Sequence, residues 1–113
     1  MIKIYHNPRC SKSRESLSIL EASGKNFETI KYLEEVPSEK ELREIIDLLN
    51  IKPENLIRKN EEVWKTHYKN KILTDEQLIK IMIENPKLIE RPIVINGNKA
   101  VIGRPPTTVK SIL

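Results

Sequence analysis

The first 33 residues constrain the fold most, because they predict a strand, a turn, a helix and a second strand in that order. Residues 1–5 alternate apolar and polar side chains, as a half-buried strand does. Residues 6–9 contain a proline and favour a turn, and residues 10–23 carry apolar positions at helical spacing. Residues 27–33 supply a second apolar strand. This is the order of a βαβ unit, whose strands run parallel and are joined by a right-handed crossover.

The middle of the chain predicts helices that begin at capping boxes. Ser38 is followed three residues later by Glu41, and Thr74 is followed at the same spacing by Gln77. In this pattern the two side chains bond free backbone N–H groups of the first helical turn. Apolar residues follow both boxes at helical spacing, and the Asn-Pro pair at 85–86 ends the second helix.

The end of the chain returns to strands. Residues 92–95 and 99–102 are short apolar runs, and the Asn-Gly-Asn sequence between them is typical of a hairpin turn. Residues 107–113 can form a closing helix. The complete order predicts an α/β protein with a mixed four-stranded sheet flanked by helices, which is the order of a thioredoxin-like fold. We expect residues 1–113 to be a single domain, with a helical insertion at about residues 35–90 between the second and third strands.

The composition excludes several classes of protein. A single cysteine excludes an intramolecular disulfide framework, and two histidines add too few ligands for a metal site. No apolar run approaches the ~20 residues of a membrane helix, and residues 1–5 lack the apolar segment of a signal peptide. Aromatic residues make up 4% of the chain, which gives little support for base stacking on nucleic acid. We therefore expect a cytoplasmic monomer with no metal, no membrane and no nucleic-acid partner.

The charges are distributed unevenly along the chain. Residues 1–14 and residues 91–113 each carry four basic side chains and no acidic one. All 16 acidic residues lie between Glu15 and Glu90, so the middle of the chain is net negative although the whole chain is +4. If the two ends meet in the fold, they create a local positive field. The alternative is an ordinary solvated charged surface.

Cys10 lies where the predicted turn passes into the first helix. The free N–H groups of a helix N-terminus stabilise a thiolate there and lower the pKa of the thiol. Arg9, Lys12 and Arg14 add positive charge, and Ser13 offers a hydroxyl donor. The same location binds phosphate-like anions. The alternative, a small apolar residue in the core, fits poorly with so polar a neighbourhood.

Residues 7–14 resemble the N-P-x-C-x-x-S-R signature of the glutaredoxin-dependent arsenate reductases. The resemblance continues at residues 56–60 (Leu-Ile-Arg-Lys-Asn), 90–94 (Glu-Arg-Pro-Ile-Val) and 103–105 (Gly-Arg-Pro), in the family's order. The compact C-terminal end is closer to the short, arsenate-reductase-like branch of this family. The resemblance implies a thioredoxin-like fold. It also implies catalytic roles for Cys10, His6 and Ser13, substrate binding by Asn7, Arg58, Arg91 and Arg104, and no metal.

These residue types suit the implied roles. Arginine is always charged and presents a planar fork to the oxygens of a tetrahedral anion, which lysine cannot do. For each arginine alone, a surface position or a structural ion pair is the alternative. A cationic His6 would favour the Cys10 thiolate, and an exposed loop histidine is the alternative. By its resemblance to the cis-proline of thioredoxin-like folds, we also expect a cis bond between Arg91 and Pro92.

The resemblance and the single cysteine together imply a mechanism that depends on external thiols. The Cys10 thiolate attacks arsenate, or a similar oxyanion, and water leaves. Glutathione, the external reductant, then attacks the adduct and releases arsenite, and glutaredoxin clears the mixed disulfide from Cys10. No bound cofactor is expected.

Two other functions remain open from the sequence. Spx-type transcription regulators share this fold and bind RNA polymerase, but they use a C-x-x-C redox switch. Ser13 stands at the position of its second cysteine, so this chain lacks the switch. The other alternative is a glutaredoxin-like thiol–disulfide exchanger that acts on glutathione mixed disulfides without an oxyanion.

Overall fold

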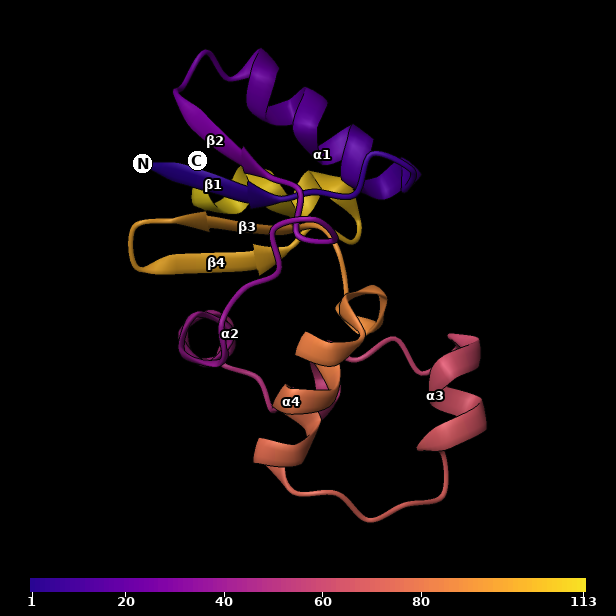
Figure 1. The fold of residues 1–113 in the computed structure, drawn as a ribbon. Coiled ribbons are helices and arrows are strands. Elements are labelled where there is room, and N and C mark those ends of the chain that lie inside the picture. Colours follow the sequence, from indigo (N-terminus) through magenta and orange to yellow (C-terminus); the bar gives the residue numbers. More distant parts are fainter. The chain divides into compact units, whose positions relative to one another are not determined.

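The computed structural model describes residues 1–113, and the chain divides into two compact units (Figure 1). The first consists of Met1–Glu35 and Arg91–Leu113 and contains the sheet. The second, Val36–Glu90, is helical and lies between the second and third strands in the sequence. The assignment of both units to a single domain stays a prediction. None of the helices has the length and apolar character that crossing a membrane requires.

The sheet is mixed and has four strands, in the order β2-β1-β3-β4. They are β1 (Ile2–Tyr5), β2 (Phe27–Ile30), β3 (Ile93–Asn96) and β4 (Lys99–Ile102). β1 and β2 run parallel, and β3 is antiparallel to both β1 and β4. This confirms the mixed four-stranded sheet predicted from the sequence, with a βαβ unit at its start.

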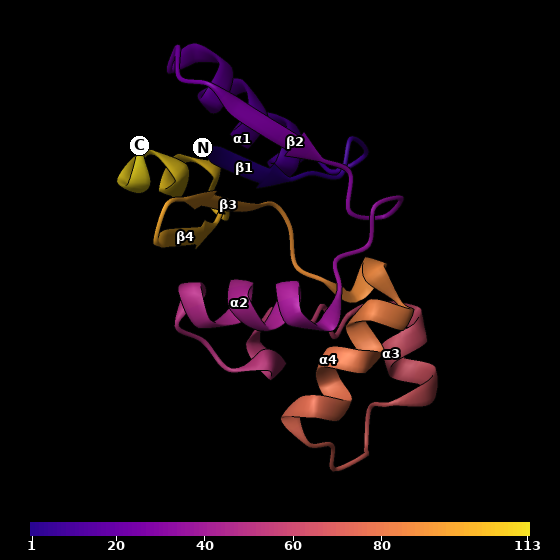
Figure 2. The ribbon, with the colours of Figure 1, turned by 60° about the vertical axis from the view of Figure 1, so that its left-hand side comes forward.

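One face of the sheet is covered by α1 (Ser11–Ala22) and the 3-10 helix η3 (Pro106–Ile112) (Figure 2). α1 is the crossover between the two parallel strands, and η3 follows β4. Both pack on the sheet through a buried apolar cluster, which removes this surface from water and thereby stabilises the unit. The cluster consists of Ile2, Ile4, Leu20, Val94, Val109 and Ile112.

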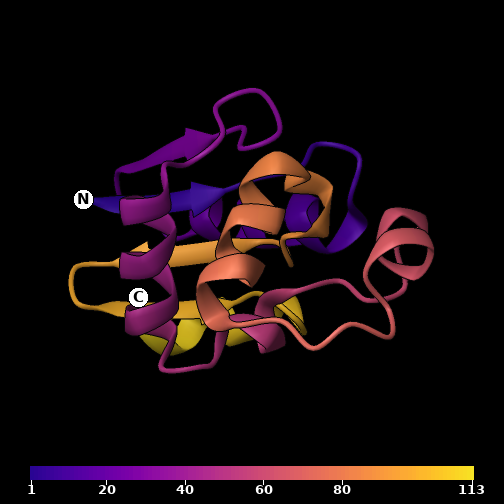
Figure 3. The same cartoon turned by 60° about the horizontal axis from the view of Figure 1, so that its bottom comes forward.

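The helical unit is built around two amphipathic helices, α2 (Glu39–Leu49) and α4 (Asp75–Glu84), which lie side by side (Figure 3). α4 also packs against the 3-10 helices η1 (Pro53–Leu56) and η2 (Pro86–Leu88). A short helix, α3 (Glu62–His67), lies between η1 and α4 in the sequence.

Both predicted capping boxes are confirmed. The Ser38 hydroxyl accepts the Glu41 N–H at 3.1 Å, and the Thr74 hydroxyl accepts the Gln77 N–H at 3.2 Å. The Glu41 and Gln77 side chains accept the N–H groups of their caps in return. α2 and α4 therefore begin where the sequence predicts, because each box satisfies otherwise free donors.

Two predicted elements differ from the structure. β2 ends at Ile30 rather than at residue 33, because the chain turns at Lys31, whose carbonyl accepts the N–H groups of Glu34 and Glu35 at 3.0 and 2.8 Å. The closing helix is a 3-10 helix from Pro106, one residue before the predicted start. Three consecutive β-branched residues at 107–109 disfavour a regular α-helix there.

The beginning of β3 and the end of β4 lie close together, and a proline follows an arginine at each place. The Arg91–Pro92 bond is cis, as predicted, and the Arg104–Pro105 bond is cis as well, which was not predicted. The Gly103 N–H donates to the Pro92 carbonyl at 2.9 Å. A Cβ atom on Gly103 would collide with the Ser16 hydroxyl and the Pro92 ring, so only glycine fits this approach.

Candidate functional site

Three segments leave the sheet at the same end. β1 ends at Tyr5, which pairs with Ile93 at the beginning of β3, and Ile93 pairs with Ile102 at the end of β4. Because β3 is antiparallel to both neighbours, the loop after β1 lies at the same end as the segments before β3 and after β4. The two basic ends of the chain therefore meet in the sheet unit. These segments carry Cys10, Arg91 and Arg104.

Cys10 is the N-cap residue of α1, with φ −98° and ψ 122°. Its N–H donates to the Asn7 carbonyl at 3.0 Å, and its carbonyl accepts the Arg14 N–H at 3.0 Å. No side chain caps the helix, so the thiol occupies the position of a capping oxygen and is half-buried. The predicted location of Cys10 at a helix N-terminus is confirmed.

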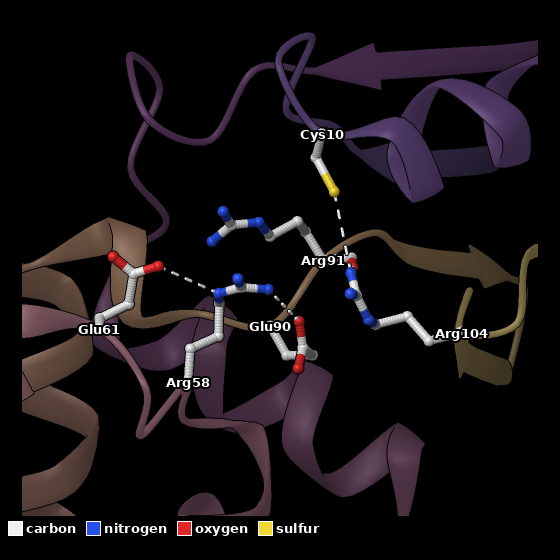
Figure 4. Close-up of polar contacts among 6 residues, drawn as sticks. All are labelled: Cys10, Arg58, Glu61, Glu90, Arg91 and Arg104. Atoms are coloured by element: carbon white, nitrogen blue, oxygen red, sulfur yellow. Dashed lines mark hydrogen bonds and ion pairs between the residues drawn. The ribbon is translucent and has the colours of Figure 1, made fainter.

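Two guanidinium groups stabilise the thiolate of Cys10. Nη1 of Arg104 lies 3.8 Å from the sulfur and also donates to the Arg91 carbonyl at 3.0 Å (Figure 4). Burial alone raises the pKa of the Cys10 thiol. Hydrogen bonds from the Ser13 N–H, the Arg91 and Arg104 side chains and the Lys12 N–H outweigh it, and the pKa is lowered from its ordinary value.

This lowered pKa predicts how alkylation of Cys10 by iodoacetamide depends on pH. Only the thiolate reacts, so the rate of the folded protein reaches half its maximum at a lower pH than that of the same protein unfolded in urea. The rate in each state is measured by mass spectrometry between pH 4 and pH 10, a range of about six units that spans both transitions. Coincident curves would contradict stabilisation of the thiolate by the fold.

Ser13, His6 and Asn7 form a buried hydrogen-bonded group beneath the Cys10 loop. The Ser13 hydroxyl lies 2.6 Å from Nδ1 of His6 and accepts the Asn7 N–H at 3.0 Å. The Ser13 side chain is therefore engaged with these two residues, and it is its backbone N–H that stabilises the thiolate. All three residues are buried.

The structure corrects the expected charge of His6. Burial, Lys31 and Arg14 all lower the pKa of its imidazole, so the neutral form is favoured and the prediction of a cationic His6 is wrong. The histidine is also not an exposed loop residue, since only 5% of it is accessible. The neutral ring holds Ser13, and through it the loop that carries Cys10.

Removing the Ser13 hydroxyl is expected to destabilise the fold. Ser13→Ala leaves Nδ1 of His6 and the N–H of Asn7 without their buried partner, at a cost of about 1–3 kcal/mol in the free energy of unfolding. Ser11→Ala is the control, because Ser11 stands in the same helical turn with its side chain exposed. Urea unfolding followed by circular dichroism measures both variants. Equal midpoints for the two would show that the buried hydroxyl contributes nothing.

Asn7 shapes the loop before the thiol. Its side-chain oxygen accepts the Arg9 N–H at 3.0 Å, and its carbonyl accepts the Cys10 N–H. These two bonds close the turn that delivers Cys10 to the helix N-terminus. The predicted contact of Asn7 with substrate stays a prediction.

Arg58 belongs to the helical unit and lies between two carboxylates. Its Nη1 is 2.9 Å from Glu90 and its Nε is 3.4 Å from Glu61 (Figure 4). Burial lowers the pKa of Arg58, but Glu90 and Glu61 outweigh it and raise the pKa. The arginine is thus part of a structural ion-pair group, and its predicted role in binding an anion stays a prediction.

Three further residues near the thiol have a part in the site that the sequence did not predict. Lys31 and Glu34 line a cavity beside the loop that carries Cys10, and Gly103 permits the close approach of the segments that carry the two arginines. Lys31 carried no signal because residues 27–33 were predicted as a strand, and Glu34 follows them as one of the many acidic residues in the middle of the chain. Gly103 carried a signal, since it directly precedes an Arg-Pro pair.

Comparison with known proteins gives consistent matches. A family model described as the ArsC family matches residues 5–112. A Haemophilus influenzae protein named arsenate reductase is 46% identical over 112 residues, which cover 97% of each chain. An Escherichia coli arsenate reductase is 40% identical over 113 residues, 99% of this chain and 80% of the relative. The solved structure of an arsenate reductase from Vibrio cholerae is 45% identical with TM-score 0.94, covering 99% of this chain and 97% of that one.

The family match includes the segments that carry Cys10, Arg91 and Arg104 and extends over the helical unit and nearly all of the sheet unit. The similarity in sequence and in structure also confirms the thioredoxin-like fold. With its family model matched over nearly the complete sequence, the chain belongs to the ArsC family.

Proposed function

We propose that this protein is an arsenate reductase in which the Cys10 thiolate attacks arsenate. The observation that carries the proposal is the arrangement of Cys10, Arg91 and Arg104: a half-buried thiol has the Arg104 guanidinium 3.8 Å from its sulfur, and both arginines lower its pKa. A nucleophile and a preformed anion site at one place are what attack on an oxyanion requires. Relatives that share 39–46% of their residues with this chain are named arsenate reductases.

The proposed reaction begins at the Cys10 sulfur. The Cys10 thiolate forms a bond to arsenic, and one arsenate oxygen leaves as water after protonation. A glutathione thiolate then attacks the Cys10 sulfur. The sulfur–arsenic bond breaks with its electron pair on arsenic, which becomes arsenite. Cys10 and glutathione are left as a mixed disulfide, and glutaredoxin attacks the glutathione sulfur and returns the Cys10 thiolate.

The arginines supply the electrostatic part of this reaction. Arg91 and Arg104 hold the oxyanion beside the sulfur and neutralise the charge that gathers during attack. We propose Arg58 as the third anion-binding arginine, on the resemblance of residues 56–60 to the family pattern. Because Glu61 and Glu90 already pair with its guanidinium, Arg58 attracts an anion less strongly than an unpaired arginine would.

The chain itself has no second thiol with which to resolve the oxidised Cys10. We therefore propose glutathione and glutaredoxin as the external thiols, with no bound cofactor. We propose that the protein acts as a monomer in the cytoplasm, where small thiols keep cysteines reduced.

The test of this function is arsenate-dependent oxidation of NADPH in a coupled assay with glutathione, glutaredoxin and glutathione reductase. We expect turnover that requires arsenate, glutathione and this protein together. If a separate sample shows that Cys10 reacts with iodoacetamide at low pH, an absence of turnover by the untreated protein would contradict arsenate as the substrate. A glutathione mixed disulfide reduced at the same rate without any oxyanion would favour a thiol–disulfide exchanger instead.

A further inference from the structure

A cavity of about 480 Å³ lies in the sheet unit beside the loop that carries the thiol. One wall is the loop before Cys10, which contributes Pro8 and Arg9, and the other is the turn after β2, which contributes Lys31, Leu33 and Glu34. Its volume falls in the range of about 300–1,000 Å³ that is usual for small-molecule sites. A tetrahedral oxyanion would leave most of this space empty.

The side chains that line the cavity carry a mixed set of charges. Arg9, Lys31 and Arg91 are cationic, and Glu34 is anionic. Lys31 and Glu34 lie in one turn, in which the Glu34 N–H donates to the Lys31 carbonyl at 3.0 Å. Both residues are exposed, and neither side chain forms an ion pair in the structure. An ammonium and a carboxylate are therefore available together to a ligand.

The cavity lies beside residues that neighbour the reactive sulfur. Arg91 lines the cavity, and its side chain also lowers the pKa of the Cys10 thiol. On the opposite wall, Arg9 directly precedes Cys10 in the loop that Asn7 closes. The cavity is therefore bounded by the residue that precedes Cys10 and by an arginine that acts on its thiol.

We propose that this cavity binds glutathione by its charged ends and presents the peptide thiol to Cys10; the proposal rests on the function proposed above. At neutral pH glutathione has two carboxylates and one ammonium group, which complement the three cations and the single anion of the cavity. Glu34 binds the γ-glutamyl ammonium, and Lys31 and Arg9 bind carboxylates. Arg91 closes the end of the cavity nearest the sulfur.

Binding is tested with S-methylglutathione, which keeps the charged groups but has no reactive thiol. Two-dimensional NMR titration of the protein is expected to show saturable binding. Lys31→Gln and Glu34→Gln each remove one charge-assisted contact and should raise the dissociation constant about tenfold. Lys25→Gln and Glu35→Gln are the matched controls, because they remove the same charges from exposed positions of the sheet unit outside the cavity. Their binding should equal that of the unmodified protein.

Kinetics supply the second readout. In the coupled assay, Glu34→Gln should raise the KM for glutathione about tenfold without a matching rise in the KM for arsenate. No binding of S-methylglutathione, or equal weakening in the cavity variants and their controls, would overturn the proposed site. Tighter binding by Glu34→Gln would overturn it too, since the cavity would then recognise anions alone.

The two proposals fail in different ways. Binding of S-methylglutathione that depends on Lys31 and Glu34, in a protein without arsenate turnover, would uphold the glutathione site and refute the arsenate reductase. Arsenate turnover without such binding would uphold the reductase and refute the site.

Discussion

Replacing Cys10 with serine is expected to abolish arsenate-dependent turnover, with a loss of at least ~10³-fold in kcat. Serine fits the same space, but its hydroxyl is not ionised near neutral pH and cannot form the mixed disulfide whose formation reduces arsenic. Arg91 and Arg104 cannot compensate, because they stabilise a charge that the variant does not develop. The measurement is the NADPH-coupled rate at saturating arsenate and glutathione.

The control for this variant is Ser11→Ala, which changes the exposed neighbour of Cys10 in the first turn of α1 and should keep its turnover. Urea unfolding of Cys10→Ser should give a midpoint close to that of the unmodified protein, since the thiol packs in no apolar cluster. Turnover that survived in Cys10→Ser would contradict nucleophilic attack by this residue.

Replacing Arg104 with alanine is expected to lower kcat/KM for arsenate by about 10²–10³-fold. The guanidinium 3.8 Å from the Cys10 sulfur stabilises the thiolate and is proposed to hold the anion, and both contributions are lost together. The kcat/KM of Arg104→Lys should fall between those of the unmodified protein and Arg104→Ala. Lysine keeps the charge but lacks the planar fork that reaches the Arg91 carbonyl and an oxyanion together. Lys110→Ala, at an exposed cation of the same unit, is the matched control.

The pH profile separates the two roles of Arg104. The guanidinium lowers the pKa of Cys10, so its removal raises that pKa and less thiolate is present near neutral pH. Raising the pH should therefore recover part of the activity of Arg104→Ala, while the loss of anion binding persists as a raised KM for arsenate. An alkylation profile of Cys10 that did not move to higher pH in Arg104→Ala would contradict this contact.

Most of the fold could be predicted from local sequence signals. The helices begin at Ser38 and Thr74 because their capping side chains satisfy nearby donors, and the hairpin turns at Gly97, which has a φ of 63°. The end of β2 at Ile30 could not be predicted, because the apolar pattern runs on to residue 33 while Lys31 already turns the backbone. Apolar spacing does not distinguish a strand from the turn that follows it.

The candidate site was predicted less completely. Cys10, Arg91 and Arg104 share one end of the sheet, as the basic ends of the chain suggested. The neutral state of His6 depends on its burial and on Lys31, a residue distant in the sequence, and neither can be derived from the loop itself. The cavity with Lys31 and Glu34 depends on tertiary structure in the same way.

The measurement that tests the central claim most directly is the intact mass of the protein after incubation with glutathione and arsenate, without glutaredoxin. We expect one glutathionyl group on Cys10 that forms only when arsenate is present, with release of an equal amount of arsenite. Phosphate is the control, since it matches arsenate in shape and charge but is not reduced, and it should give no adduct. The same adduct with phosphate or with glutathione alone, or none with arsenate, would contradict arsenate reduction at Cys10.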